Sequence, residues 1–147
     1  MNDDFIIDEN ILFNARRGID ENGKRTLDER IFMYNFFQSD KKLPHTPNIR
    51  NQYYRIGQTE VEDETYQDAG LMKWFYQRLV DGNLCPVIEG LSIPKYRFIK
   101  PGDDEFVYLA IVREGNLVTA DRSLEDEIKK EGLKVKYVFA KDAISLV

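Results

Sequence analysis

The sequence predicts one α/β domain over residues 1–147, built around a parallel sheet. The last third alternates a helix at 104–113, a strand at 117–120, a helix at 124–131 and a strand at 135–139. Such alternation is typical of a parallel sheet with right-handed crossovers. A short apolar strand also opens the chain at residues 5–8. With 147 residues, 42% of them hydrophobic, the chain is long enough to bury a substantial core.

The first half of the chain is expected to be mainly helical. A short helix is predicted at 9–16 and a loop at 18–24. Thr26 and Glu29 have the spacing of a capping box, which opens a largely buried helix. That helix is expected to place Leu27 and Ile31 on one apolar face and Phe32 on another. A short strand is predicted at 41–45.

The middle of the chain is punctuated by proline and glycine. Thr46 and Pro47 predict the N-cap and first residue of a helix at 47–56, which Gly57 would end. Residues 58–64 are expected to be a loop, and apolar pairs at a spacing of four predict a helix at 65–80. Residues 82–101 hold three prolines and two glycines and favour irregular structure or a short strand near 96–99. Further along, Ser123 is the expected N-cap of the helix at 124–131, and Gly132 its end.

Composition narrows the class of protein. The net charge is −5, which argues against a surface coated for nucleic acid but leaves room for a local basic stripe. No apolar run approaches 18 residues, so no membrane association is expected. The acidic start and the single cysteine favour a reducing cytoplasm. Cys85 is expected to be a packing residue and His45 a loop or strand-end residue, so neither zinc nor thiol chemistry is expected.

Acidic residues follow the predicted strands and open one predicted helix. Asp8 ends the first strand, Asp121 follows a late strand, and Asp103 and Asp104 begin the helix between them. Strand carboxyl ends and helix amino ends share one rim of a parallel α/β sheet. Converging carboxylates repel one another unless a cation neutralises them, and oxygen-only clusters suit Mg²⁺ or Mn²⁺. The sequence therefore predicts a metal site at this rim.

These segments resemble the PIN domain, a small metal-dependent nuclease fold. The resemblance is carried by IIDEN at residues 6–10, DD at 103–104 with the helix through Ala110, LVTADRSL at 117–124 and GLKVKYV at 132–138. It implies a three-layer α/β/α sandwich with a parallel sheet of about five strands, PIN-like and Rossmann-like. It also implies an acidic pocket that binds one or two Mg²⁺ or Mn²⁺ ions and hydrolyses phosphodiester bonds in RNA.

The resemblance assigns roles to individual residues. Asp8 would be the first acid, Asp103 the third and Asp121 the fourth; these three would be catalytic and bind the metal, with Asp104 a supporting or alternative ligand. Thr119 would hydrogen-bond within the pocket, and Asn10 would be the polar residue that often follows the first acid; both would support the metal ligands. The sequence departs from the family at the second acid, where the helix at 47–56 offers Gln52, a neutral amide. Acids of the following loop could reach inward instead: Glu60, Glu62 and Glu64.

In such a pocket the cation lowers the pKa of a bound water and stabilises the charge at phosphorus. Basic residues beside it would hold RNA phosphates. The chosen candidates are Arg16, Arg50, Arg55 and Arg122, within a wider basic set that includes Lys95, Arg97 and Lys100. Tyr53, Tyr54 and Tyr96 are candidates to stack on unpaired bases, which favours single-stranded RNA.

Other interpretations stay open at this point. Each acid has a structural alternative, because Asp103 suits an N-cap and Asp121 a turn. The chain could be a catalytically impaired PIN-like module that binds RNA or protein, for which Gln52 is the motive. It could also be a receiver-like domain, for which Lys141 is partial support. A homodimer and an antitoxin-type protein partner are likewise left open.

Overall fold

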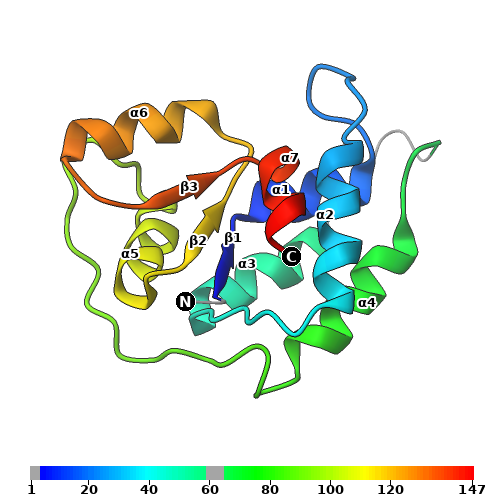
Figure 1. Ribbon diagram of the computed structural model, residues 1–147, viewed down its shortest axis with the longest axis horizontal. Coiled ribbons are helices and arrows are strands. Elements are labelled where there is room, and N and C mark those ends of the chain that lie inside the picture. Colours follow the sequence, from blue (N-terminus) through cyan, green and yellow to red (C-terminus); the bar gives the residue numbers. More distant parts are fainter. Residues whose placement is uncertain (1–3, 59–64) are drawn as a thin grey trace.

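The computed structural model describes residues 4–58 and 65–147 as a mixed α/β protein with a parallel sheet (Figure 1). The strands are β1 (Phe5–Ile7), β2 (Asn116–Val118) and β3 (Lys136–Val138). The helices are α1 (Glu9–Arg17), α2 (Leu27–Gln38), α3 (Pro47–Gln58), α4 (Ala69–Leu79), α5 (Asp103–Arg113), α6 (Arg122–Glu131) and α7 (Ala140–Ala143), followed by the 3₁₀ helix η1 (Ile144–Leu146). In Figure 1, α1, α2 and α4 lie on one side of the strands and α5 and α6 on the other.

The sheet is smaller than predicted. Its order is β1-β2-β3, all parallel, with Ile6 opposite Leu117 and Leu117 opposite Tyr137. The parallel α/β class is confirmed, but the described residues form three strands, and the predicted strands at 117–120 and 135–139 are shorter. The segment at 41–45 makes only isolated parallel bridges, from Lys42 to Asp4 and from His45 to Val87. Pro44 lies in this segment and Pro86 lies next to Val87. Proline lacks the amide donor that the hydrogen-bond ladder of a sheet needs.

Two helix boundaries differ from the prediction. α4 begins at Ala69, because the Asp68 carboxylate accepts the Leu71 amide at 3.1 Å and so caps the helix there. α3 continues through Gly57 to Gln58. A Cβ atom at Gly57 would lie 2.0 Å from the Tyr76 hydroxyl oxygen, so this glycine allows a close approach rather than ending the helix.

Helix caps also differ in detail. Thr26 is the N-cap of α2 without a capping bond, because its hydroxyl donates to the Asn14 carbonyl at 2.6 Å. The predicted capping box is therefore wrong. Asp121, rather than Ser123, is the N-cap of α6. Gly132 ends α6 in the left-handed conformation at φ 71°, as predicted.

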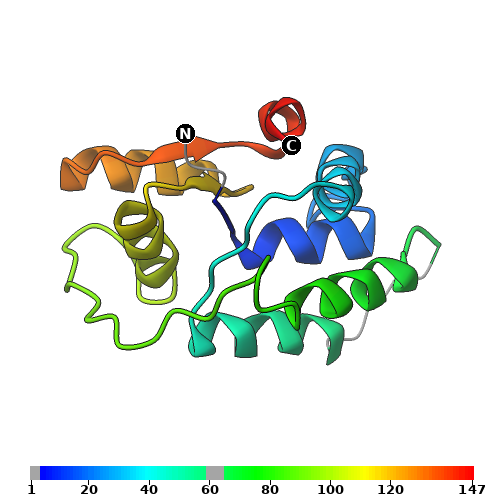
Figure 2. The same cartoon turned by 60° about the horizontal axis from the view of Figure 1, so that its bottom comes forward.

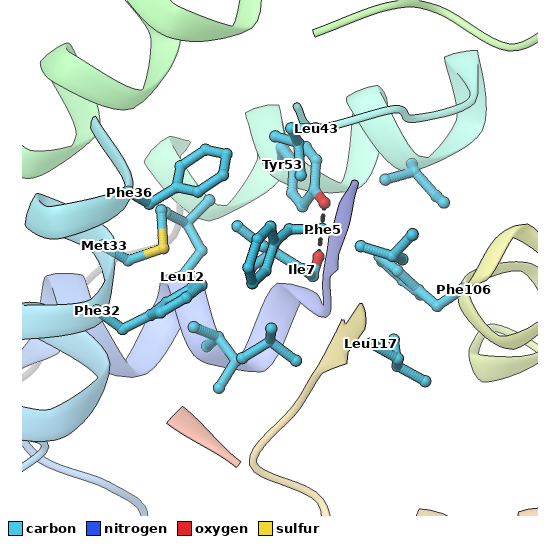
Figure 3. Close-up of a cluster of buried hydrophobic side chains, with 14 of the residues drawn as sticks. Phe5, Ile7, Leu12, Phe32, Met33, Phe36, Leu43, Tyr53, Phe106 and Leu117 are labelled. Carbon is cyan, nitrogen blue, oxygen red and sulfur yellow. Dashed lines mark hydrogen bonds between the residues drawn. The ribbon is translucent and has the colours of Figure 1, made fainter. Parts of the chain in front are cut away.

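The core joins the sheet to helices on both sides (Figure 3). Phe5 lies 6.0 Å, centroid to centroid, from both Phe32 and Phe36 of α2. α2 buries this face, whereas Leu27 and Ile31 are 51% and 46% exposed, so the prediction that they are buried is wrong. Residues 82–101 form no helix or strand, in line with their prolines.

The helices are short. The longest have 12 residues, whereas about 20 apolar residues are needed to span a bilayer. Among residues 4–58 and 65–147, no helix has the length and apolarity to cross a membrane.

Candidate metal centre

Asp8 lies where β1 passes into α1. It is the N-cap of α1, but its side chain makes no capping bond and is only 3% exposed. Its Oδ2 atom instead accepts the Thr119 hydroxyl at 2.9 Å and the Asn10 side-chain amide at 3.3 Å. Asp8 is therefore a buried carboxylic acid held from two chain segments that are more than 100 residues apart in sequence.

Asn10 and Thr119 connect these two segments. Asn10 Nδ2 donates to Thr119 Oγ1 at 3.4 Å, and Asn10 Oδ1 accepts the Ala120 amide at 3.1 Å. Thr119 Oγ1 also accepts the Asp121 amide at 3.1 Å. The carboxyl ends of β1 and β2 are thus fixed to each other around Asp8 by the side chains of Asn10 and Thr119.

The acids of this rim interact electrostatically. The pKa of Asp8 is raised from 3.8 to about 7, first by burial and further by the charges of Asp103 and Glu9, while the Thr119 hydrogen bond opposes the rise. The pKa of Asp103 is raised to about 6 by burial and by the charges of Asp121 and Glu127. Asp103 therefore interacts electrostatically with both Asp8 and Asp121, and these three acids are here named the acidic rim.

Asp104 and Asp121 also have backbone roles. Asp104 Oδ1 accepts the amides of Gly102 and Glu105, at 3.1 and 2.8 Å. Asp121 Oδ1 accepts the amide and the hydroxyl of Ser123. Asp104 thus turns toward the start of α5, whereas the charge of Asp121 still acts on Asp103.

Two further acids, Glu9 and Glu127, act on the acidic rim by their charge, and the sequence did not predict them. The charge of Glu9 acts on both Asp8 and Asp103. Glu127 Oε2 is buried and has no hydrogen-bond partner within the described part of the chain. A signal for Glu127 exists in the sequence, because it follows Leu124 by three residues and so lies on the buried stripe of α6.

The predicted basic candidates separate into two groups. The Arg16 guanidinium donates to the Ile56 carbonyl in a buried contact, and that of Arg50 donates to the Leu79 carbonyl at 3.2 Å, so both close helix ends. Arg55 is exposed, and its charge acts on Glu9. Arg122 lies over the Phe139 ring at 5.3 Å. Of these four candidates, Arg55 and Arg122 are exposed and Arg16 and Arg50 are not.

The remaining predicted residues are spread around the site. Gln52 is half-buried on α3, whereas Glu60, Glu62 and Glu64 lie outside the described residues. Tyr53 is fully buried, so its ring cannot stack on a base. Its hydroxyl donates to the Ile7 carbonyl at 2.5 Å (Figure 3). Cys85 is buried, which raises its pKa to about 11 and keeps the thiol protonated.

The donor chemistry of the rim fits a hard divalent cation. All its ligands would be carboxylate oxygens, and a cation would relieve the repulsion that raises the pKa values of Asp8 and Asp103. Among the described residues, no three His, Cys, Asp or Glu side chains are arranged so that they could hold one ion together. Mg²⁺ is usually held by one or two carboxylates and keeps several waters, so a pair of these acids meets its need.

Fold and site together define a mixed α/β protein with an acidic rim at the carboxyl ends of parallel strands. Comparison of the chain with protein-family models, with curated proteins and with solved structures gives no match.

Proposed function

We propose that this chain is a Mg²⁺- or Mn²⁺-dependent endoribonuclease of the PIN type, with Asp8, Asp103 and Asp121 as its metal-binding acids. The observation that carries the proposal is the buried Asp8 carboxyl, held by Thr119 and Asn10 and coupled to Asp103. Burying a carboxyl is unfavourable for folding, and a site of function is the usual reason for doing so.

The proposal includes a reduced five-stranded sheet. Residues 42–45 and 84–88 would extend the strand order beyond β1, since the Phe5 amide donates to the Lys42 carbonyl at 2.8 Å and the Leu43 amide to the Leu84 carbonyl at 2.7 Å. The order would then run from 84–88 through 42–45, β1 and β2 to β3. Asp8 would then stand in the middle of the sheet edge, beside the point where the strand order reverses.

The residues of the rim would act by position and charge. Two of the three rim acids Asp8, Asp103 and Asp121 would hold a cation, which supplies an activated water and charge stabilisation at the phosphate. Thr119 and Asn10 hold Asp8 in its orientation, and their hydrogen bonds favour its ionised form. The exposed cations Arg55 and Arg122 would bind flanking phosphates.

A second function is favoured by α3. This helix contains no acid, and Gln52 occupies the position where the family carries one. The alternative is therefore an RNA-binding module of the same fold without cleavage.

RNA cleavage separates the two functions. Labelled single-stranded RNA is incubated with Mg²⁺ or Mn²⁺ and the wild type, Asp8→Asn, Asp103→Asn or Asp121→Asn, with the exposed Asp126→Asn as control. Cleavage should require the cation and fall at least about 100-fold in the three rim variants but not in the control. RNA binding without cleavage would favour the second function. Cleavage that survives EDTA would contradict the first.

A further inference from the structure

The segment at residues 89–100, named here the basic segment, combines exposed cations with aromatic side chains. It carries Lys95, Arg97 and Lys100 against one acid, Glu89, in a chain whose acids outnumber its bases. Lys95, Arg97 and Lys100 are all exposed. The basic segment therefore reverses the sign of the overall charge locally.

This segment has no helix or strand but is anchored at several points. Ile99 is buried, and Leu91 and Tyr96 pack partly buried against the core. The Phe98 amide donates to the Glu131 carboxylate at the end of α6. Figures 1 and 2 show the segment running around the outside of α5 and past that end of α6. Because Leu91, Tyr96 and Ile99 pack against the core, the charged side chains between and beside them are left on the surface.

Phe98 is the aromatic counterpart of these cations. It is 41% exposed, which is unusual for a phenylalanine, and the Arg97 guanidinium lies 5.3 Å from its ring centroid. A flat ring and a flat guanidinium side by side match an unpaired base and its phosphate.

The basic segment leads directly to the acidic rim. The Lys100 carbonyl accepts the amides of Asp103 and Asp104, at 3.1 and 3.2 Å, and so begins α5. The charge of Lys100 also acts on Asp103. A polyanion bound along residues 95–100 would therefore end beside Asp103.

We propose that the basic segment is a binding path for single-stranded RNA, in which Lys95, Arg97 and Lys100 contact phosphates and Phe98 stacks on a base. The proposal rests on the proposed function, since it takes RNA as the substrate of the acidic rim. A single strand is favoured over a duplex because only unpaired bases can reach an aromatic side chain.

Binding can be measured without cleavage. Fluorescence anisotropy of a labelled single-stranded RNA of about 12 nucleotides, in EDTA, compares the wild type with Lys95→Glu/Arg97→Glu. The matched control is Lys24→Glu/Lys73→Glu, which makes the same charge change at exposed positions outside the segment. The segment variant should raise Kd at least about tenfold and lower the slope of log K against log salt by about 1.4, since each phosphate contact contributes about 0.7. The control should stay within about twofold of the wild type.

Phe98 tests the stacking separately from charge. Phe98→Ala should raise Kd about tenfold and leave the salt slope unchanged, while Phe98→Tyr should bind like the wild type. Equal binding by the wild type and the segment variant, equal losses in the segment variant and the control, or a wild type that binds no RNA would overturn the inference. Normal RNA binding by a wild type that never cleaves would instead overturn the proposed nuclease function alone.

Discussion

At the scale of single residues, Asp8 carries the account. Its carboxyl group is buried, receives two side-chain hydrogen bonds and still has a pKa of about 7. The sequence located it correctly, because a buried strand that runs into an aspartate is visible in the residue pattern. Glu127 was missed: its spacing from Leu124 places it on the buried face of α6, but the residue pattern alone does not reveal that its charge acts on Asp103.

The raised pKa of Asp8 predicts how stability depends on pH. A carboxyl whose pKa rises from 3.8 to about 7 on folding binds more protons in the folded state than in the unfolded state between these pH values. The free energy of unfolding of the metal-free protein should therefore fall as the pH rises from 4 to 7. Asp8→Asn should remove much of this fall and raise the free energy of unfolding at pH 8 by about 2–4 kcal/mol. Urea melts in EDTA at pH 5 and pH 8 measure it, with Asp126→Asn as control. An unchanged pH dependence in Asp8→Asn would contradict the assignment.

Gln52 gives a second prediction at this scale. Gln52→Glu adds a negative charge at the position that the proposed PIN-type site assigns to a second acid, so Mn²⁺ should bind about tenfold more tightly and cleavage should rise. The metal-free protein should become less stable, because the added charge repels its neighbours. Isothermal titration and thermal melts measure both effects, and Asn51→Asp places the same charge on an exposed position of α3. If Gln52→Glu leaves the affinity for Mn²⁺ unchanged, Gln52 does not face the acidic rim.

At the scale of elements, local signals predicted the helices better than the strands. The left-handed Gly132 and the amphipathic α6 follow from a few neighbouring residues. The segments at 42–45 and 84–88 do not, because their pairing is made by long-range backbone contacts around two prolines. Arg16 and Arg50 were assigned to RNA for a related reason: the sequence does not show which arginines close helix ends.

The attachment of α3 to β1 is testable at this scale. The Tyr53 hydroxyl, fully buried, donates to the Ile7 carbonyl next to Asp8 (Figure 3). Tyr53→Phe leaves that carbonyl unsatisfied and should lower the free energy of unfolding by about 1–3 kcal/mol. Urea denaturation measures the loss, and Tyr54→Phe, at an exposed tyrosine of the same helix, should cost less than about 0.5 kcal/mol. Equal losses in the two variants would contradict a specific role for this bond.

At the scale of the whole molecule, the topology brings together what the sequence separates. Parallel strands place Asp8 and Thr119 side by side although more than 100 residues lie between them, and α5 adds Asp103. The sequence-based expectation that Asp8, Asp103 and Asp121 converge rested on their places at strand ends and at a helix start. The size of the sheet was overestimated: about five strands were predicted, and the described residues form three. The accessible basic surface near the rim also shifted, from Arg16 and Arg50 to the basic segment.

The acidic rim is proposed to bind a divalent cation. Electron paramagnetic resonance measures the binding of Mn²⁺ to the protein directly, without RNA. Titration of the wild type should remove the signal of free Mn²⁺ up to about one or two ions per chain, and Mg²⁺ should compete. Asp8→Asn and Asp103→Asn should each weaken binding at least about tenfold, whereas Asp126→Asn should not. Binding that is absent from the wild type, or equal in all four proteins, would contradict the claim.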